Sequence, residues 1–193
     1  MKIRSDYVSN SSSSSFIVIV SNGNDYTTSI AEAMRGYAEE WTPYCFPNDA
    51  YKHDFGWEFE DTSDFGGKMN FIGLQLLELF IMKCREATRP HTADGCKRQW
   101  SGKDFDRCYD MLKKVCKEQF GFNIKLNDDL IKTSINDGKD GYHLWQGLDS
   151  GYYIDHQSAV CEDSCMEMFD SEDALYNFLR FEESYIQGGN DNV

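Results

Sequence analysis

One histidine and two cysteines near the end of the chain have residue types that could form a metal site. His156, Cys161 and Cys165 form the pattern H-x4-C-x3-C, and imidazole and thiolate groups are common zinc ligands. His143 or Cys96 could supply the fourth ligand. Structural zinc sites usually contain paired C-x2-C motifs, which this sequence lacks. We therefore favour buried or surface side chains over a zinc site.

Acidic and hydroxyl residues in the same stretch suggest two other kinds of chemistry. Asp155, Glu162 and Asp163 offer the oxygen ligands that magnesium prefers. Asp155, His156 and Ser158 supply the residue types of a catalytic triad, but adjacent residues of a strand point to opposite faces and cannot assemble one. The sequence contains no G-x-S-x-G, P-loop, G-x-G-x-x-G or H-E-x-x-H motif. These observations do not favour an enzyme. We expect no cofactor, and keep zinc and magnesium as alternatives.

A block of small polar residues directly precedes the most β-prone run of the chain, FIVIV at residues 16–20. Hydroxyl groups and backbone amides can bind phosphate, but phosphate-binding loops normally lead into a helix N-terminus, whereas this block leads into a strand. We favour an exposed connection between two strands, and keep a phosphate-binding loop and a segment recognised by another protein as alternatives. The block consists of Asn10, Ser11, Ser12, Ser13, Ser14 and Ser15.

Basic residues are concentrated between residues 97 and 117 and could contact nucleic acid. Arginine and lysine side chains around Trp100 could hold phosphate while the indole stacks on a base. The net charge of −14 opposes this role, because the whole chain repels a polyanion. We therefore interpret the segment as a solvated helix face and expect no direct nucleic-acid partner. Its basic residues are Lys97, Arg98, Lys103, Arg107, Lys113, Lys114 and Lys117.

The strongest charge signal is the acidic C-terminal part, residues 149–193, which contains 11 acidic residues and one basic residue. A surface of this sign attracts basic surfaces on other proteins and associates faster at low salt. Aromatic side chains could anchor such a contact; the candidates are Trp145, Tyr152 and Tyr153. The candidate partner-binding carboxylates are Glu162, Asp163, Glu167, Asp170, Glu172, Asp173, Glu182 and Glu183.

The elements that position these residues follow from the hydrophobic pattern. Residues 2–8 and 16–20 are predicted strands, and the second is continuously apolar, as is typical of a strand buried on both faces. Thr27 or Thr28 begins a predicted helix that runs to about residue 41. A further strand is expected at residues 57–59.

Three more helices and one hairpin are predicted after residue 69. Residues 70–87 form the most apolar helix, which Pro90 ends. Ser101 and Asp104 resemble a capping box and begin a helix over residues 104–120. Its buried face is predicted to contain Phe105, Cys108, Leu112, Val115 and Cys116.

The C-terminal part contains a predicted hairpin over residues 143–158 and a final helix over residues 171–181. Ser171 begins this helix, and acidic residues in its first turn suit the helix dipole. Leu175, Phe178 and Leu179 are expected to dock it on the core.

Length and composition indicate one folded domain, residues 1–193, because the chain has 193 residues and an aromatic share of 15%. The order of the elements favours an α+β fold: a single compact domain with a small mixed or antiparallel sheet packed by about three to four helices. No segment reaches the ~18 apolar residues needed to span a bilayer, and the N-terminus lacks the apolar region of a secretory signal. We therefore expect a cytoplasmic protein, with no membrane partner and with reduced cysteines.

The two ends of the chain resemble known sequences. MKIRSDYVSNSSSSSFIV resembles an N-terminal signature of uncharacterised proteins from bacteriophages and their bacterial hosts, and GYYIDHQSAV and SYIQGGNDN are similar to C-terminal patterns in some of them. The resemblance covers about residues 1–20 and 149–193. It implies a phage or mobile-element setting and carries over no catalytic residue.

Charge and resemblance together lead to one main functional hypothesis. We expect an acidic protein-binding module that engages the basic surface of a host protein, such as a nucleic-acid-binding defence enzyme inhibited by an anti-CRISPR or anti-restriction mechanism. One alternative is an enzyme or binding protein for a phosphorylated small molecule or nucleotide, with the serine block near its site. The other alternative is a virion or structural component.

Overall fold

The computed structural model describes residues 16–25, 54–55, 62–88, 100–124, 153–154 and 166–187. Helices and short paired strands occur together within these ranges, which confirms the α+β composition at this level. The elements predicted at residues 2–8, 27–41 and 57–59 lie outside them. None of the helices in the described ranges has the length and apolarity that crossing a membrane requires.

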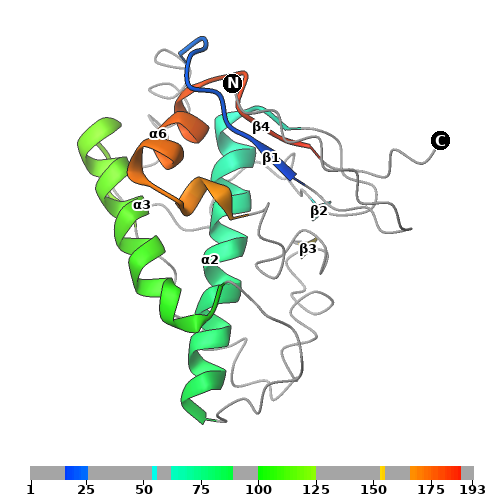
Figure 1. Ribbon diagram of the computed structural model, residues 1–193, viewed down its shortest axis with the longest axis vertical. Coiled ribbons are helices and arrows are strands. Elements are labelled where there is room, and N and C mark those ends of the chain that lie inside the picture. The colour runs from blue at the N-terminus through cyan, green and yellow to red at the C-terminus, as the bar shows by residue number, and fades with distance from the viewer. Residues whose placement is uncertain are drawn as a thin grey trace, which may run out of the picture.

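The longest helix, α2 (Phe65–Thr88), runs side by side with α3 (Phe105–Gln119) in the opposite direction (Figure 1). It begins ahead of the predicted start at residue 70. The carboxylate of Asp64 accepts a hydrogen bond from the Gly67 N–H at 2.8 Å. This bond satisfies a donor that the first turn of a helix otherwise leaves unpaired, so the helix can begin five residues earlier, at Phe65, without apolar periodicity.

A one-turn 3-10 helix, η2 (Gly102–Asp104), leads into α3. Of the two predicted capping residues, Ser101 precedes η2 and Asp104 is its last residue. The Ser101 N–H donates to Asp104 Oδ2 at 3.0 Å, which is the backbone half of a capping box. The predicted apolar face of α3 is confirmed. All five of its side chains are buried: Phe105, Cys108, Leu112, Val115 and Cys116.

The last helix, α6 (Glu172–Arg180), also agrees with the sequence prediction. The Ser171 side chain caps it by accepting the Ala174 N–H at 3.0 Å. Its apolar side chains Leu175, Phe178 and Leu179 are fully buried. A one-turn 3-10 helix, η5 (Glu167–Phe169), precedes it.

Two pairs of short strands complete the described part. β1 (Phe16–Val18) pairs antiparallel with β4 (Tyr185–Gln187), with Ile17 opposite Ile186. This confirms the first three residues of the strand predicted at residues 16–20. Val18, Ile19 and Val20 are only half-buried, so the expected burial on both faces is not observed. β4 is a strand that the sequence analysis missed. β2 (Asp54–Phe55) pairs parallel with β3 (Tyr153–Ile154), which is the described part of the predicted 143–158 hairpin.

The core lies where α2, α3 and α6 meet, and the β1–β4 pair lies beside one end of the helices (Figure 1). Two aromatic residues that follow α3, Phe120 and Phe122, pack edge-on against Phe65 at the start of α2. Phe120 also contacts Tyr176 of α6. Burial of this apolar surface is the main force that holds the three helices together.

Candidate functional site

The acidic segment formed by η5 and the first turn of α6 is held on α3 by two basic residues. Arg107 Nη1 donates to the carbonyl O of Phe169 at 3.0 Å. Lys114 Nζ lies 2.7 Å from Glu172 Oε2, and this ion pair joins α3 to α6. The basic side of α3 and the acidic C-terminal part therefore neutralise each other in part within the molecule.

Two carboxylates of this segment, Asp170 and Asp173, point into solvent. Both residues are exposed, and within the described residues their side chains form no hydrogen bond or ion pair. Their backbone is nevertheless well held, because the Asp170 N–H donates to the carbonyl O of Glu167 at 3.1 Å and Ser171 caps the helix that follows. The segment thus presents negative charge from a rigid support.

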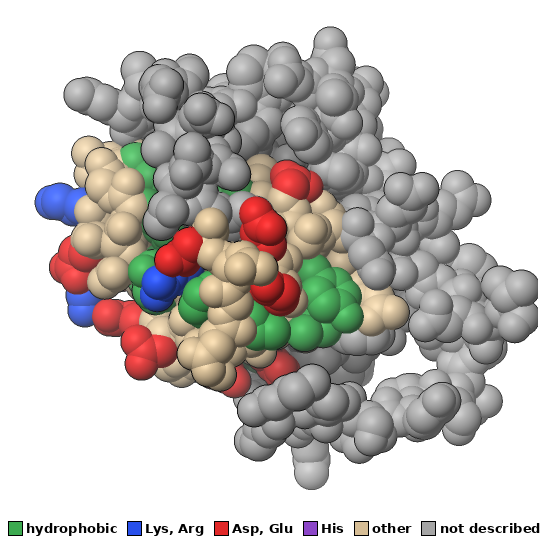
Figure 2. All heavy atoms as spheres, turned by 90° about the horizontal axis from the view of Figure 1, so that it is seen from above, with side chains coloured by type: hydrophobic (Ala, Val, Ile, Leu, Met, Phe, Trp, Pro, Cys, Tyr) green, Lys and Arg blue, Asp and Glu red, His purple; other side chains and the backbone are tan. Residues whose placement is uncertain are grey.

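The acidic turn after α6 is used differently. The Glu183 carboxylate accepts the backbone N–H of Asn24 at 2.8 Å and its side-chain amide at 2.6 Å. Glu183 is therefore engaged in holding the loop that follows β1. Glu182 is exposed, and among the described residues its carboxylate has no hydrogen-bond partner. Figure 2 looks down on the end of the molecule where α6 and β4 lie, and shows acidic side chains gathered there with basic ones among them.

A shallow hollow of about 180 Å³ lies beside Asp170. Trp100, Asp104, Arg107 and Phe169 form the rest of its lining. The Arg107 guanidinium lies 5.0 Å from the centre of the Trp100 ring and 3.6 Å from the Asp104 carboxylate, so both groups are already engaged. Asp170 is the lining carboxylate that a positively charged side chain of a partner could approach.

The basic face of α3 does not have the features of a nucleic-acid site. Trp100 is 5% exposed and lies under Arg107, so its ring is not available to stack on a base. Lys113 pairs with Asp110 at 2.6 Å. Within residues 100–124, Lys103 and Lys117 are exposed and form no ion pair. Ion pairs therefore offset the positive charge of Arg107, Lys113 and Lys114, whereas Lys103 and Lys117 have no such pair within the described residues.

Several candidate residues lie outside the described ranges. They are the serine block (Asn10, Ser11, Ser12, Ser13, Ser14 and Ser15), the H-x4-C-x3-C residues (His156, Cys161 and Cys165) with their possible fourth ligands His143 and Cys96, and Glu162, Asp163, Trp145, Tyr152, Asp155, Ser158, Lys97 and Arg98. Tyr153 is placed only through its backbone, in β3. The described ranges contain no group of side chains able to hold a metal ion.

No relative is found. The chain matches no protein-family model, no curated protein and no solved structure. The geometry of the described residues therefore carries the functional argument.

The most unusual side chain of the described part is one that the sequence analysis did not single out. Lys68, in the first turn of α2, is 0% exposed. Its Nζ donates to the carbonyl O of Phe181 at 2.7 Å. A single lysine in the sequence GGKMN has no signal that separates it from a solvated lysine, because its burial depends on α6 ending beside it.

Proposed function

We propose that this protein acts by binding the basic surface of another protein through the acidic segment of residues 167–173. The observation that carries the proposal is the exposure of Asp170 and Asp173 on a segment that α3 and the Ser171 cap hold in place. A rigid support lowers the entropy that is lost when a complex forms. Exposed charges of one sign also increase the rate of association with an oppositely charged partner.

The rest of the proposal concerns the partner and its setting. The resemblance to phage proteins makes host defence enzymes with nucleic-acid grooves the first class of partner to test, in the cytosol of the host cell. Asp170 and the hollow beside it would receive a lysine or arginine side chain of that partner, and Glu182 would add a more distant contact. In this proposal the chain is a single α+β domain, residues 1–193.

The test uses the full chain with two exposed carboxylates neutralised, D170N/D173N. Affinity purification from phage-infected host cells is followed by a binding measurement with the purified partner over a series of salt concentrations. We expect the variant to lose at least about tenfold in affinity, because each tenfold loss corresponds to only ~1.4 kcal/mol of lost charge contacts. The affinity of the unmodified protein should fall as salt increases.

A matched control has the same change in net charge at exposed positions outside the acidic segment. Q119K/N123K adds two positive charges at exposed positions, one at the last residue of α3 and one shortly after it. This control should retain the partner. Equal binding by D170N/D173N and the unmodified protein, or equal losses in both variants, would contradict the proposal.

A further inference from the structure

A buried lysine joins α2 to the end of α6. Lys68 Nζ donates to the carbonyl O of Phe181, the residue that follows the last turn of α6, at 2.7 Å. The same Nζ lies 5.5 Å from the centre of the Phe178 ring. The side chain is 0% exposed, so any water that reaches its amine must follow a movement of the surrounding elements.

The Phe181 carbonyl that accepts this hydrogen bond belongs to the corner of residues 181–187, which contains the turn after α6 and strand β4. Backbone hydrogen bonds hold the corner on two sides. The Glu182 N–H donates to the carbonyl O of Asn24 at 3.0 Å, and the Ile186 N–H donates to that of Thr62 at 2.9 Å. Strand pairing with β1, the bonds from Asn24 to Glu183 and the bonds of the Ser184 hydroxyl also hold the corner. An opening of the corner breaks these bonds together with the bond to Lys68.

Within the described residues, the charges of three carboxylates act on the amine of Lys68. Asp64 precedes the first turn of α2, and Glu182 and Glu183 lie in the corner. Their charges favour the protonated amine, but burial opposes it more strongly, so the pKa of Lys68 falls from 10.5 to about 7. An opened corner that admits water would return the amine to its ordinary pKa.

We propose that Lys68 is a protonation-controlled latch on the corner of residues 181–187. The neutral amine holds the corner closed against α2, and a proton on the amine favours an opened state in which Nζ is hydrated. This inference does not depend on the proposed function. It bears on that function, because the corner contains Glu182, and opening would change the position of this carboxylate relative to Asp170 and Asp173.

The direction of the effect follows from proton linkage. Between about pH 7 and 10.5 the opened corner holds a proton that the closed corner does not. The equilibrium constant for opening therefore increases about tenfold for each unit by which the pH falls through this window. Below about pH 7 both states are protonated, and opening reaches a plateau.

Hydrogen exchange of the corner amides tests the latch in the unmodified full chain. The intrinsic exchange rate of an amide is proportional to hydroxide concentration, whereas opening decreases by the same factor as pH rises. The two dependences should cancel above about pH 7. We therefore expect the Glu182 and Ile186 amides to exchange at a rate independent of pH, with a single isotopic envelope at each pH, and faster than the core amides of Leu112 and Cys116.

The variant K68M is the control, because it removes the titrating group and keeps an apolar side chain of similar length. Its corner amides should exchange in proportion to hydroxide concentration. Three results would overturn the latch. They are a rate proportional to hydroxide in the unmodified protein, a pH-independent rate retained in K68M, or corner amides that exchange only as fast as the core amides of α3. The first and third need no variant, so the test holds even if K68M does not fold.

Discussion

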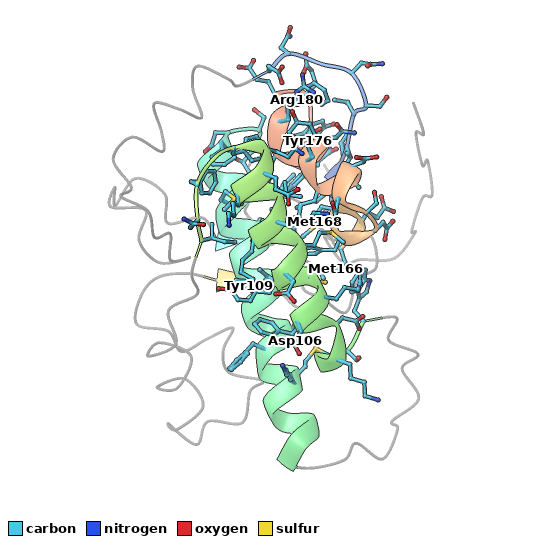
Figure 3. The ribbon with its side chains drawn as sticks, turned by 90° about the vertical axis from the view of Figure 1, so that its left-hand side faces the viewer. Asp106, Tyr109, Met166, Met168, Tyr176 and Arg180 are labelled. Carbon is cyan, nitrogen blue, oxygen red and sulfur yellow. The ribbon has the colours of Figure 1, made fainter. Side chains whose placement is uncertain are left out.

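Arg180 and Asp25, which are 155 residues apart in the sequence, form a two-point ion pair between the last turn of α6 and the loop after β1. Arg180 Nη2 donates to Asp25 Oδ2 at 2.7 Å, and Nε donates to Oδ1. Arg180 lies next to Tyr176 (Figure 3). Its guanidinium is 5.2 Å from the centre of the Tyr176 ring and 4.9 Å from that of the Phe181 ring. This arrangement leaves Arg180 little freedom, so the pair attaches the N-terminal loop to the last helix.

Neutralising Asp25 should lower thermal stability at neutral pH. The hydrogen bond from Arg180 holds the pKa of Asp25 below its usual value of 3.8. The pair therefore contributes stability at pH values above 3.8, and the contribution is lost as pH falls through the lower pKa of the folded state. We expect D25N to have a lower thermal midpoint than the unmodified protein at neutral pH, measured by circular dichroism, with a difference that shrinks in acid.

The control for D25N is D170N, which removes the same charge from an exposed carboxylate that lacks an ion pair in the described residues. Its thermal midpoint should change little, because isolated surface charges contribute little to stability. Equal shifts in both variants would show that net charge, rather than the pair with Arg180, sets the stability.

A methyl group at Gly102 should separate α2 from η2, the turn that leads into α3. A Cβ built on Gly102 would lie 2.2 Å from the backbone N and 2.3 Å from the Cα of Lys83. Backbone atoms cannot move aside as the end of a side chain can, so we expect G102A to lose about 3 kcal/mol of unfolding free energy, the upper part of the range for overpacking. Urea unfolding followed by circular dichroism measures this loss.

G121A separates this steric effect from the general cost of replacing glycine. Gly121 has a φ of 77°, and a Cβ there would meet no atom within 4 Å. Its replacement should cost only about 1 kcal/mol, the price of a left-handed conformation for an alanine. A loss in G102A no larger than in G121A would mean that the two helices adjust to the added methyl group.

The two cysteines of α3 should be inert in the folded protein. Burial raises the pKa of Cys108 to about 12 and raises that of Cys116 further. Alkylating reagents attack the thiolate, which neither residue forms at mildly alkaline pH. We expect no modification of Cys108 or Cys116 by iodoacetamide in the native protein and full modification in urea, as measured by peptide mass spectrometry. Rapid labelling without denaturant would show that α3 is not packed as described.

The buried amine of Lys68 should also make global stability depend on pH. The lowered pKa means that the unfolded chain binds a proton more strongly than the folded protein between about pH 7 and 10.5. Stability from this group therefore increases with pH in that window, by about 1.4 kcal/mol per unit. The difference in unfolding free energy between the unmodified protein and K68M should change with this slope, as measured by urea unfolding at several pH values.

K103M provides the matched control for this pH series. Lys103 is exposed and forms no ion pair in the described residues, so its replacement removes the same charge without affecting a buried site. The stability of K103M should follow that of the unmodified protein at every pH. If the stability of K68M also changes with pH as that of the unmodified protein does, the amine of Lys68 is hydrated in the folded state.

The local sequence was sufficient to predict α3 and α6, which have one apolar face and capping residues at their start. The apolar spacing in α3, the Ser101 and Asp104 pair before it, and the Ser171 cap of α6 all correspond to observed features. They could be predicted because caps and helical periodicity involve residues within about four positions of each other. The strand at β1 was predictable for a similar reason, since its β-branched run is apolar on both faces.

Tertiary structure decided how the charges are used, because charge pairing depends on contacts between residues far apart in the sequence. The acidic excess of residues 149–193 predicted that Glu172 and Glu183 bind a partner, whereas the fold pairs Glu172 with Lys114 and places Glu183 on Asn24. The short strand β4 exists because β1 and Thr62 supply hydrogen-bond partners on its two sides. Lys68 is buried for the same reason: the end of α6 closes over an amine that its own neighbours in the sequence would leave in water.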